Sequence, residues 1–229
     1  MKILFTAIMA TLLASTTFAQ DTEKPAPDQS GLHFGLKAAP SLAWLRTDTK
    51  GIESDGSKFG FSYGLITEFR FAPNYAFATG LDVTYRGGKF KRAITLLDTI
   101  TKTTSSISLQ YIEIPVTLKL KTNQIGYLTY YLQAGVAPGL NIRAKADYET
   151  TLQSGTYTLN GTESNVDVKD DINNFNLSMI IGGGLEYTLS GSTTLLVGVQ
   201  FNNGFLDVID GDEIKANSNY LALTIGILF

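Results

Sequence analysis

The 229-residue sequence contains no cysteine and a single histidine. Without cysteine the chain can form no disulfide and has no acceptor for a lipoprotein anchor. Acidic side chains outnumber basic ones by 21 to 18, which gives a net charge of −3 at pH 7. Because nucleic-acid-binding domains carry clustered positive charge, this balance argues against a nucleic-acid partner.

Long apolar runs are also missing. A transmembrane helix needs roughly 20 consecutive apolar residues, and no stretch reaches that length. The first residues, MKILFTAIMATLLASTTFAQ, have a positive charge at Lys2, a short apolar run and small residues up to Ala19. This pattern predicts a secretory signal peptide over residues 1–19. Residues 20–31 are polar and contain proline, so we expect a flexible periplasmic lead-in there, followed by one domain over residues 32–229. Any membrane insertion must then use β-strands.

Apolar side chains recur at every second position in eight stretches. In FGFSYGLITEFRF, for example, Phe59, Phe61 and Tyr63 alternate with Gly60 and Ser62. Successive side chains of a strand point to opposite faces, so this period predicts strands with one apolar face. The eight stretches are residues 32–45, 59–71, 75–86, 111–121, 127–143, 174–187, 193–202 and 219–229.

The connections alternate between short and long. Short turns are expected near residues 72–74, 122–126 and 188–192, and long polar loops at 46–58, 87–106, 144–172 and 203–218. Short periplasmic turns, long outer loops and an even strand number are typical of outer-membrane barrels. The sequence therefore predicts an all-β protein, an eight-stranded antiparallel up-and-down transmembrane β-barrel. It would lie in the outer membrane of a Gram-negative bacterium with both termini periplasmic.

Aromatic residues collect at the expected strand ends, as they do at the two membrane interfaces. The short-turn end has Phe34, Phe69, Phe71, Tyr75, Phe77, Tyr130, Tyr187 and Phe229; the long-loop end has Trp44, Phe59, Phe61, Tyr85, Phe175 and Phe201. The strand that ends at Phe229 is expected to close the barrel against the first strand. It is also the segment through which we expect the barrel-assembly machinery to act.

Charged residues fall on the opposite register, which predicts that they face the lumen. They are His33, Lys37, Glu68, Arg70, Asp82, Arg86, Glu113, Lys119, Lys121, Arg143 and Glu186. Both signs are present, so the pattern favours a neutralising network over a selective pore. Pro40, Pro115 and Pro138 each remove a ladder donor and predict bulges or kinks. Ile107 and Leu109 are out of phase with Ile112, which indicates a bulge near Gln110 or a later strand start.

The chain resembles the PorT-like outer-membrane β-barrel proteins of Bacteroidetes. The resemblance rests on GLKAAPSLAWL, FSYGLITEF, YAFATGLDVTYRGG, YIEIPVTLKLK, IIGGGLEY and LALTIGILF, and it covers most of residues 32–229. These motifs mark strands and turns, and none is catalytic. The resemblance implies an eight-stranded outer-membrane barrel. One branch of the family is linked to protein secretion, so a role as a secretion accessory is an alternative.

The sequence predicts no catalytic residue, no cofactor-binding residue and no metal ligand. His33 lies at the inner end of the first strand, away from the outer rim where a barrel enzyme would need its base. Two acidic stretches, Asp207–Glu213 and Asp167–Asp171, lack the spacing of an EF-hand and are interpreted as solvated loops. Asn160 matches a glycosylation acceptor by a short pattern. Arg86–Arg92, RGGKFKR, is a basic stretch that either pairs with lipopolysaccharide phosphates or is an ordinary solvated loop.

The leading interpretation is a non-enzymatic integral outer-membrane barrel, structural or displaying its longest loop, Ala144–Ile172, to envelope protein partners. It would also contact outer-membrane lipid and lipopolysaccharide. One alternative is a soluble periplasmic lipocalin-like barrel that binds a small apolar ligand, but that fold needs an apolar lumen and a polar exterior. A lipid-modifying barrel enzyme is the third reading.

Overall fold

The computed structural model describes residues 31–96, 99–154, 156–211 and 214–229. The expected signal peptide and nearly all of the lead-in lie outside these residues. Within the described ranges, no helix combines the length and apolar character needed to span a membrane. The strands are β1 (Gly31–Thr47), β2 (Ile52–Ala72), β3 (Tyr75–Leu96), β4 (Thr99–Glu113), β5 (Val116–Lys121), β6 (Leu128–Ser154), β7 (Tyr157–Asp167), β8 (Phe175–Ser190), β9 (Thr193–Asp207) and β10 (Ala216–Leu228), with one short 3-10 helix, η1 (Lys169–Asp171).

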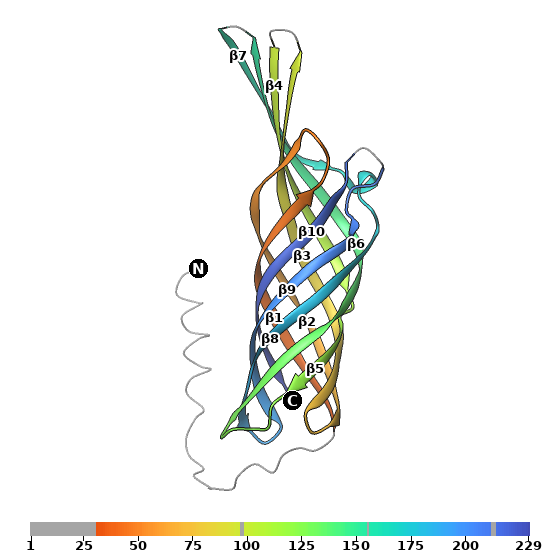
Figure 1. The fold of residues 1–229 in the computed structure, drawn as a ribbon, viewed down its shortest axis with the longest axis vertical. Coiled ribbons are helices and arrows are strands. Elements are labelled where there is room, and N and C mark those ends of the chain that lie inside the picture. Colours follow the sequence, from red (N-terminus) through yellow and green to blue (C-terminus); the bar gives the residue numbers. More distant parts are fainter. Residues whose placement is uncertain (1–30, 97–98, 155, 212–213) are drawn as a thin grey trace.

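The strands close into a ring in which every neighbouring pair is antiparallel (Figure 1). β4 and β5 are successive parts of one strand of the barrel, because both pair with β3 on one side and β6 on the other. This composite strand is interrupted at Ile114 and Pro115, which lie between β4 and β5. β10 pairs with β1, starting at Leu228 opposite Gly35, and this seals the ring. The predicted eight-stranded antiparallel barrel is confirmed.

The two faces of the wall differ as the alternation predicts. On β1, Leu32, Phe34 and Leu36 are 54%, 56% and 60% exposed, while His33 and Gly35 between them are buried. Each such large apolar side chain gains about 1.5–3 kcal/mol when fully covered by hydrocarbon. A barrel whose strands all expose such side chains is therefore suited to a lipid environment. Its apolar face is the outer one, which is the reverse of the arrangement in a lipocalin.

Both aromatic girdles are present on the outward face. At the short-turn end the rings of Phe71 and Tyr75 stack with their centroids 6.2 Å apart. At the other end Trp44 of β1 stacks on Phe201 of β9 at 6.1 Å. Phe229 lies in the inner girdle and exchanges backbone hydrogen bonds with Phe34, at 2.7 Å and 3.3 Å. The two girdles mark the interfaces between which the wall is covered by lipid.

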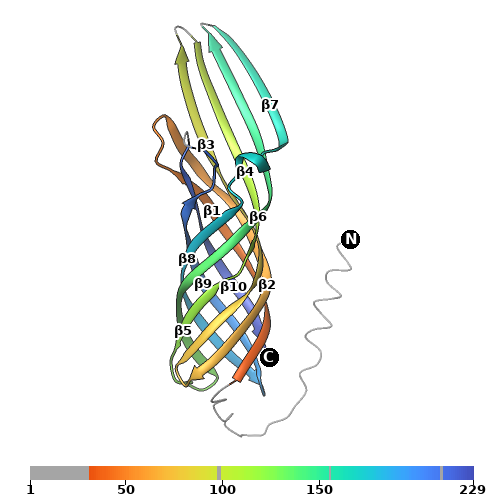
Figure 2. The same cartoon turned by 90° about the vertical axis from the view of Figure 1, so that its right-hand side faces the viewer.

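The prediction of long polar loops at 46–58, 87–106 and 144–172 was largely wrong. Most of these residues continue the strands, so that β2, β3, β4, β6 and β7 form an outer sheet that rises beyond the barrel (Figure 2). The pairing runs to the tips, where Thr99 lies opposite Ser154 and Ser154 opposite Tyr157. Threonine and tyrosine, which are enriched in strands, occur in this sheet. A search for apolar alternation misses such strands because neither face is covered.

Two local predictions about irregular backbone also need correction. No register is shifted at Pro40 or Pro138, but the β1–β10 pairing is not continuous across Ala39 and Pro40, and the strand that contains Pro115 is interrupted there. The expected bulge near Gln110 lies on the facing strand: Gln110 is opposite Arg143 and Tyr111 is opposite Asn141, so β6 carries the extra residue.

This bulge turns Arg143 outward, where it is exposed, so its predicted place in the lumen was wrong. Ile107 and Leu109 point inward without any change of phase in β4, and both are buried. The interior is apolar at the level of these two residues. Inward positions there carry apolar side chains, and the apolar period of the sequence therefore changes phase between Leu109 and Ile112.

Candidate functional site: the lumen and the outer sheet

The inner end of the lumen holds an ionic network of five residues. Nζ of Lys119 lies 2.7 Å from Oε2 of Glu68 and 2.9 Å from Oε1 of Glu186. Lys121 contacts the same two carboxylates, at 2.8 Å from Oε2 of Glu186, and also bonds Glu68. The Lys119 ammonium also lies 4.3 Å from the centre of the Tyr131 ring, a cation–π distance. Nε of Arg70 lies 3.2 Å from Oε1 of Glu68, and its Nη2 lies 3.7 Å from Oε2 of Glu186. Three cations and two anions thus share this level.

A second network occupies the middle of the lumen. Nη1 of Arg86 lies 2.9 Å from Oε1 of Glu113, and the guanidinium stands 4.1 Å from the centre of the Tyr111 ring. Thr84 and Tyr220 donate hydrogen bonds to the other carboxylate oxygen of Glu113, at 2.9 Å and 3.2 Å. The sequence predicted the inward charges, but not the two tyrosines that surround Arg86, because tyrosine is also a girdle residue.

Lys37 and Asp82 add a further inward ion pair, 2.7 Å between Nζ and Oδ2. Each inward Lys, Arg, Asp and Glu side chain of the described wall thus contacts an opposite charge, as the sequence predicted for a lumen that contains both signs.

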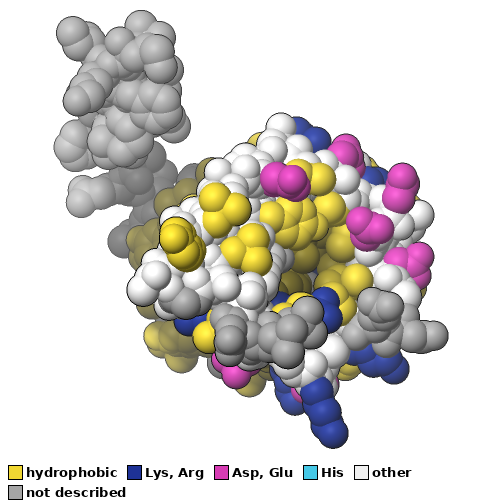
Figure 3. All heavy atoms as spheres, turned by 90° about the horizontal axis from the view of Figure 1, so that it is seen from above, with side chains coloured by type: hydrophobic (Ala, Val, Ile, Leu, Met, Phe, Trp, Pro, Cys, Tyr) yellow, Lys and Arg dark blue, Asp and Glu magenta, His cyan; other side chains and the backbone are white. Residues whose placement is uncertain are grey.

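Above these networks the lumen becomes apolar. A buried cluster fills the barrel below the outer loops, and three of its members, Val168, Ile172 and Val208, come from the segments that connect the outer strands. Seen from the outer end, hydrophobic side chains line the central hollow and acidic ones lie on its rim (Figure 3). The full cluster is Leu45, Phe90, Ile107, Leu109, Tyr111, Ala144, Ala146, Val168, Ile172, Val208 and Ala216. The interior of an eight-stranded barrel is just wide enough for side chains to fill it. Here it is filled by the ionic networks at the inner end and in the middle and by the apolar cluster above them.

The outer sheet ends in an edge strand. β7 pairs only with β6, so its other side has no neighbour among the described strands. Every residue of β7 except Val166 is exposed. Tyr157 and Leu159 are 84% and 68% exposed, and Leu159 lies opposite Leu152, which lies opposite Thr101. An uncovered strand edge with apolar side chains beside it is a template for pairing with another chain.

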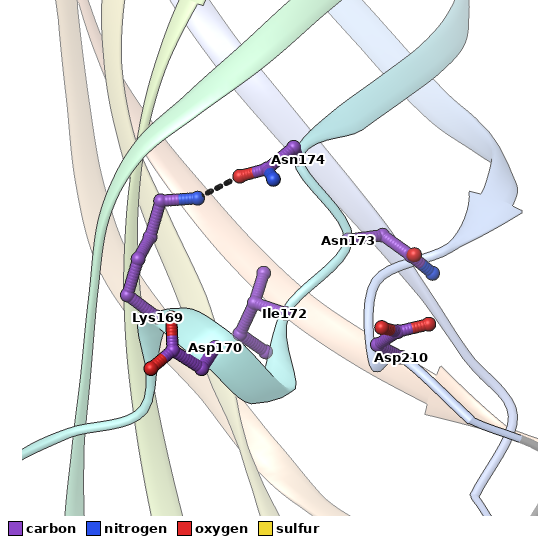
Figure 4. Close-up of a pocket in the computed structure, with 6 residues that line it drawn as sticks. All are labelled: Lys169, Asp170, Ile172, Asn173, Asn174 and Asp210. Atoms are coloured by element: carbon purple, nitrogen blue, oxygen red, sulfur yellow. Dashed lines mark hydrogen bonds between the residues drawn. The ribbon is translucent and has the colours of Figure 1, made fainter.

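A polar depression of about 540 Å³ lies at the rim where η1 meets the β9–β10 connection (Figure 4). Its lining residues are Lys169, Asp170, Ile172, Asn173, Asn174 and Asp210. Lys169 donates a hydrogen bond to Asn174, and the Asn173 amide donates to the carbonyl oxygens of Asp207 and Ile209, at 3.0 Å and 3.2 Å. These bonds hold two outer connections together.

The acidic stretches lie on the same rim. Asp170 and Asp171 belong to η1, and the backbone amide of Lys169 donates to Asp167 at 3.1 Å and lowers the pKa of that carboxyl. Residues 212 and 213 of the second stretch lie outside the described part of the chain. Within the part that is described, no group of three or more His, Asp or Glu side chains is placed to hold a metal ion.

The other predicted positions separate in space. His33 is 5% exposed at the inner end of β1 and lies opposite Glu68 in the β1–β2 register, far from the outer rim. Asn160 is exposed on β7. The basic stretch Arg86–Arg92 does not act as one patch, because Arg86 is buried in the lumen while Lys89 and Lys91 are exposed.

Comparisons with known proteins agree with this architecture. The family model described as an outer membrane protein beta-barrel domain matches residues 18–210. Comparison with curated proteins found no match.

Several solved structures are similar in fold. Neisserial surface protein A is 15% identical with a TM-score of 0.44, over 86% of this chain and 97% of that chain. OprG from Pseudomonas aeruginosa is 12% identical with a TM-score of 0.43, over 88% and 97%. Ail, the attachment invasion locus protein of Yersinia pestis, is 10% identical with a TM-score of 0.35, over 86% and 98%. Since the family model spans most of its length, this chain belongs to the outer membrane protein β-barrel domain family.

Proposed function

We propose that this outer-membrane barrel is non-enzymatic and presents its outer sheet as a docking platform for another polypeptide. The observation that carries the proposal is the free edge of β7, which is 11 residues long and almost entirely exposed. Natural proteins protect such edges with charged side chains, proline, bulges or a covering segment. In β7 the acidic residues Glu163 and Asp167 and the bulge beside Glu163 lie in the second half of the strand, which leaves Tyr157 to Thr162 without these devices. The β7 sequence, YTLNGTESNVD, contains neither proline nor lysine. A strand added here would gain backbone hydrogen bonds and contact Leu159.

The closed interior supports a role on the surface rather than a passage. Ionic pairs occupy two levels of the lumen and an apolar cluster occupies a third. Among the described residues, these layers of side chains favour neither a free aqueous path nor an apolar ligand cavity. The soluble lipocalin-like reading also conflicts with the exposed apolar wall.

A lipid-modifying enzyme is disfavoured by the place of its best candidate base. His33 lies at the short-turn end of the wall, whereas the polar rim and the depression beside η1 lie at the opposite end. Replacing His33 with alanine should leave any lipid-modifying activity found in purified protein unchanged.

Within the barrel family, we propose the PorT-like branch of Bacteroidetes, with both termini in the periplasm. The three short turns, the first residues of β1 and the end of β10 share one end of the barrel, while the outer sheet occupies the other (Figure 1). A secretion role would be one way to use the platform. Assembly through a terminal strand recognised by the barrel-assembly machinery is part of this proposal.

The docking proposal is tested by placing a photo-crosslinking residue at Asn160 on β7, and at Thr104 in the middle of the sheet as a control. In living cells we expect a discrete crosslinked polypeptide at Asn160 only, and Leu159→Lys should abolish it while Thr104→Lys does not. Equal labelling at both positions, or none at Asn160, would show that the edge is not a docking site.

A further inference from the structure

Two bulges place positive charge on the outer wall just beyond the outer girdle. In the β2–β3 pair the register shifts between Ser57 and Phe61, and Lys58 lies within this bulge. In the β4–β6 pair the shift around Ile142 turns Arg143 outward. β-bulges commonly re-aim a side chain at a functional site. Here two independent bulges deliver cations to the same stretch of wall.

These cations surround a strip of hydroxyl and amide groups on β4. Nζ of Lys58 donates hydrogen bonds to the hydroxyls of Ser106 and Ser108, at 3.1 Å and 2.6 Å. The lysine side chain reaches them across β3 beside Gly87, which lies opposite Ser108 and has no side chain in the way. In the register Lys89 lies opposite Ser106 on one side, and Lys145 opposite Ser108 on the other. Gln110, next along the strip, lies opposite Arg143.

Positive charge exceeds negative charge within this strip. Lys58 lies within electrostatic range of Lys89, which repels it, and of one acid, Asp147. Lys145 is 3.5 Å from Asp167. Among the described residues, Lys89 and Arg143 form no ion pair, in contrast to Lys91 farther out, which pairs with Asp55 at 2.6 Å. A bound anion would relieve the repulsion between the two lysines.

The strip stands directly on the outer girdle. Gln110 donates to the hydroxyl of Tyr85 at 3.0 Å, and the ring of Tyr85 stacks on that of Tyr63 at 6.4 Å. Both tyrosines face lipid and are more than 40% exposed. The cations therefore lie at the height of the lipid headgroups, on the outside of the wall that the neighbouring strands β2, β3, β4 and β6 form.

We propose that Lys58, Lys89, Arg143 and Lys145 bind a phosphate of a phosphorylated glycolipid of the outer leaflet, that is, of lipopolysaccharide. Ammonium and guanidinium groups form charge-assisted hydrogen bonds with phosphate, and the serine hydroxyls beside them supply further donors. The wall offers no enclosure for a free anion. It does offer a lipid-facing surface directly below, where Leu81 and Leu140 are exposed for acyl chains.

The test uses the full mature chain in detergent micelles, titrated with bisphosphorylated lipid A and followed by native mass spectrometry. The variant is K58Q/K89Q/R143Q. Its matched control, K91Q/R92Q/K102Q, removes the same charge from the same outer sheet, farther from the girdle. We expect the first variant to bind lipid A at least roughly tenfold more weakly, since it loses several charge-assisted bonds, and the control to bind as wild type does.

Three further arms decide between sources of the phosphate. Lipid A stripped of its phosphates should bind as weakly as the first variant, while excess inorganic phosphate and phosphatidylglycerol should not displace intact lipid A. Displacement by either one would overturn the assignment to a glycolipid, and equal loss in both triple variants would overturn the site. Heat-dependent gel mobility checks that each variant is folded. If the triple variant is not, K89Q and R143Q alone must each weaken binding.

Discussion

Nζ of Lys119 lies 2.7 Å from Oε2 of Glu68, and both side chains are completely removed from solvent. Two charges at this distance in a dry interior attract strongly, but each has lost its hydration, so the pair is stable only while both partners are present. Lys119 also bonds Glu186 at 2.9 Å. The lysine is thus the shared partner of two buried carboxylates.

Replacing Lys119 with methionine removes one buried charge-assisted hydrogen bond from Glu68 and one from Glu186, while Lys121 and Arg70 remain beside both carboxylates. We expect it to destabilise the barrel by about 1.5–3 kcal/mol for each bond that is lost. Chemical unfolding of the refolded barrel in detergent measures this change. The matched control, Lys102→Met on the outer sheet, should have little effect. The double variant Lys119→Met/Glu68→Gln should recover part of the loss; no recovery would mean that packing, not charge, decides the effect.

Gly198 makes room for Tyr131 inside the barrel. A Cβ at this position would lie 2.2 Å from the Tyr131 hydroxyl oxygen and 2.9 Å from the Gly183 carbonyl oxygen. Gly198→Ala should therefore cost about 1–3 kcal/mol of unfolding free energy, and adding Tyr131→Phe should recover part of it.

Gly161 on β7 is the control for that series, because nothing lies within 4 Å of a Cβ built there. Its replacement by alanine should change the unfolding free energy by no more than about 0.5 kcal/mol. If both alanine variants lose stability equally, the close approach of Tyr131 is not the cause.

The filled lumen predicts that the wild-type protein forms no steady channel. Single insertions in planar bilayers should show no stable conductance, and proteoliposomes should swell in sugar solutions no faster than empty ones. The physical reason is that the Arg86–Glu113 pair and the cluster around Leu109 occupy the lumen at two successive levels. A reproducible open level in the unmodified protein would contradict this arrangement.

Phe229 should matter for assembly more than for the stability of the finished barrel. Its backbone pairs with Phe34, and its ring is 56% exposed in the inner girdle. Phe71 is a girdle ring of similar exposure, 52%, at an internal position. Deletion of Phe229 should lower the amount of protein in the outer membrane of growing cells, whereas Phe71→Ala should not. Equal losses would assign the effect to the girdle rather than to the terminal strand.

The wall was predictable because lipid imposes one rule on it: every second side chain must be apolar wherever hydrocarbon is the solvent. Leu32, Phe34 and Leu36 follow that rule, and their inward neighbours could be identified from it. This alternation is no longer required beyond the outer girdle, where lipid no longer covers the strands. Beyond it, both faces of β7 meet water, so the strand leaves no apolar period in the sequence.

Contacts inside the lumen depend on shear and register, which alternation does not determine. The sequence indicated that Arg86 and Glu113 face inward, but not that Glu113 would be its partner rather than another inward acid. The bulge in β6 was misplaced because Leu140 and Ile142 keep the outward period across it, while the following Arg143 is turned to the same side. Only the pairing with β4 reveals the extra residue.

β6 has 27 residues and belongs both to the barrel wall and to the outer sheet. At about 3.3 Å per residue its contour is roughly 90 Å, several times the roughly 25 Å height of the apolar band. The strand continues through the bulge at Ile142, so the outer sheet and the barrel wall share one backbone. A force applied to the tips of the outer sheet would be transmitted along this backbone to the barrel wall as tension and torque. A partner bound at the tips would therefore keep a fixed orientation relative to the barrel.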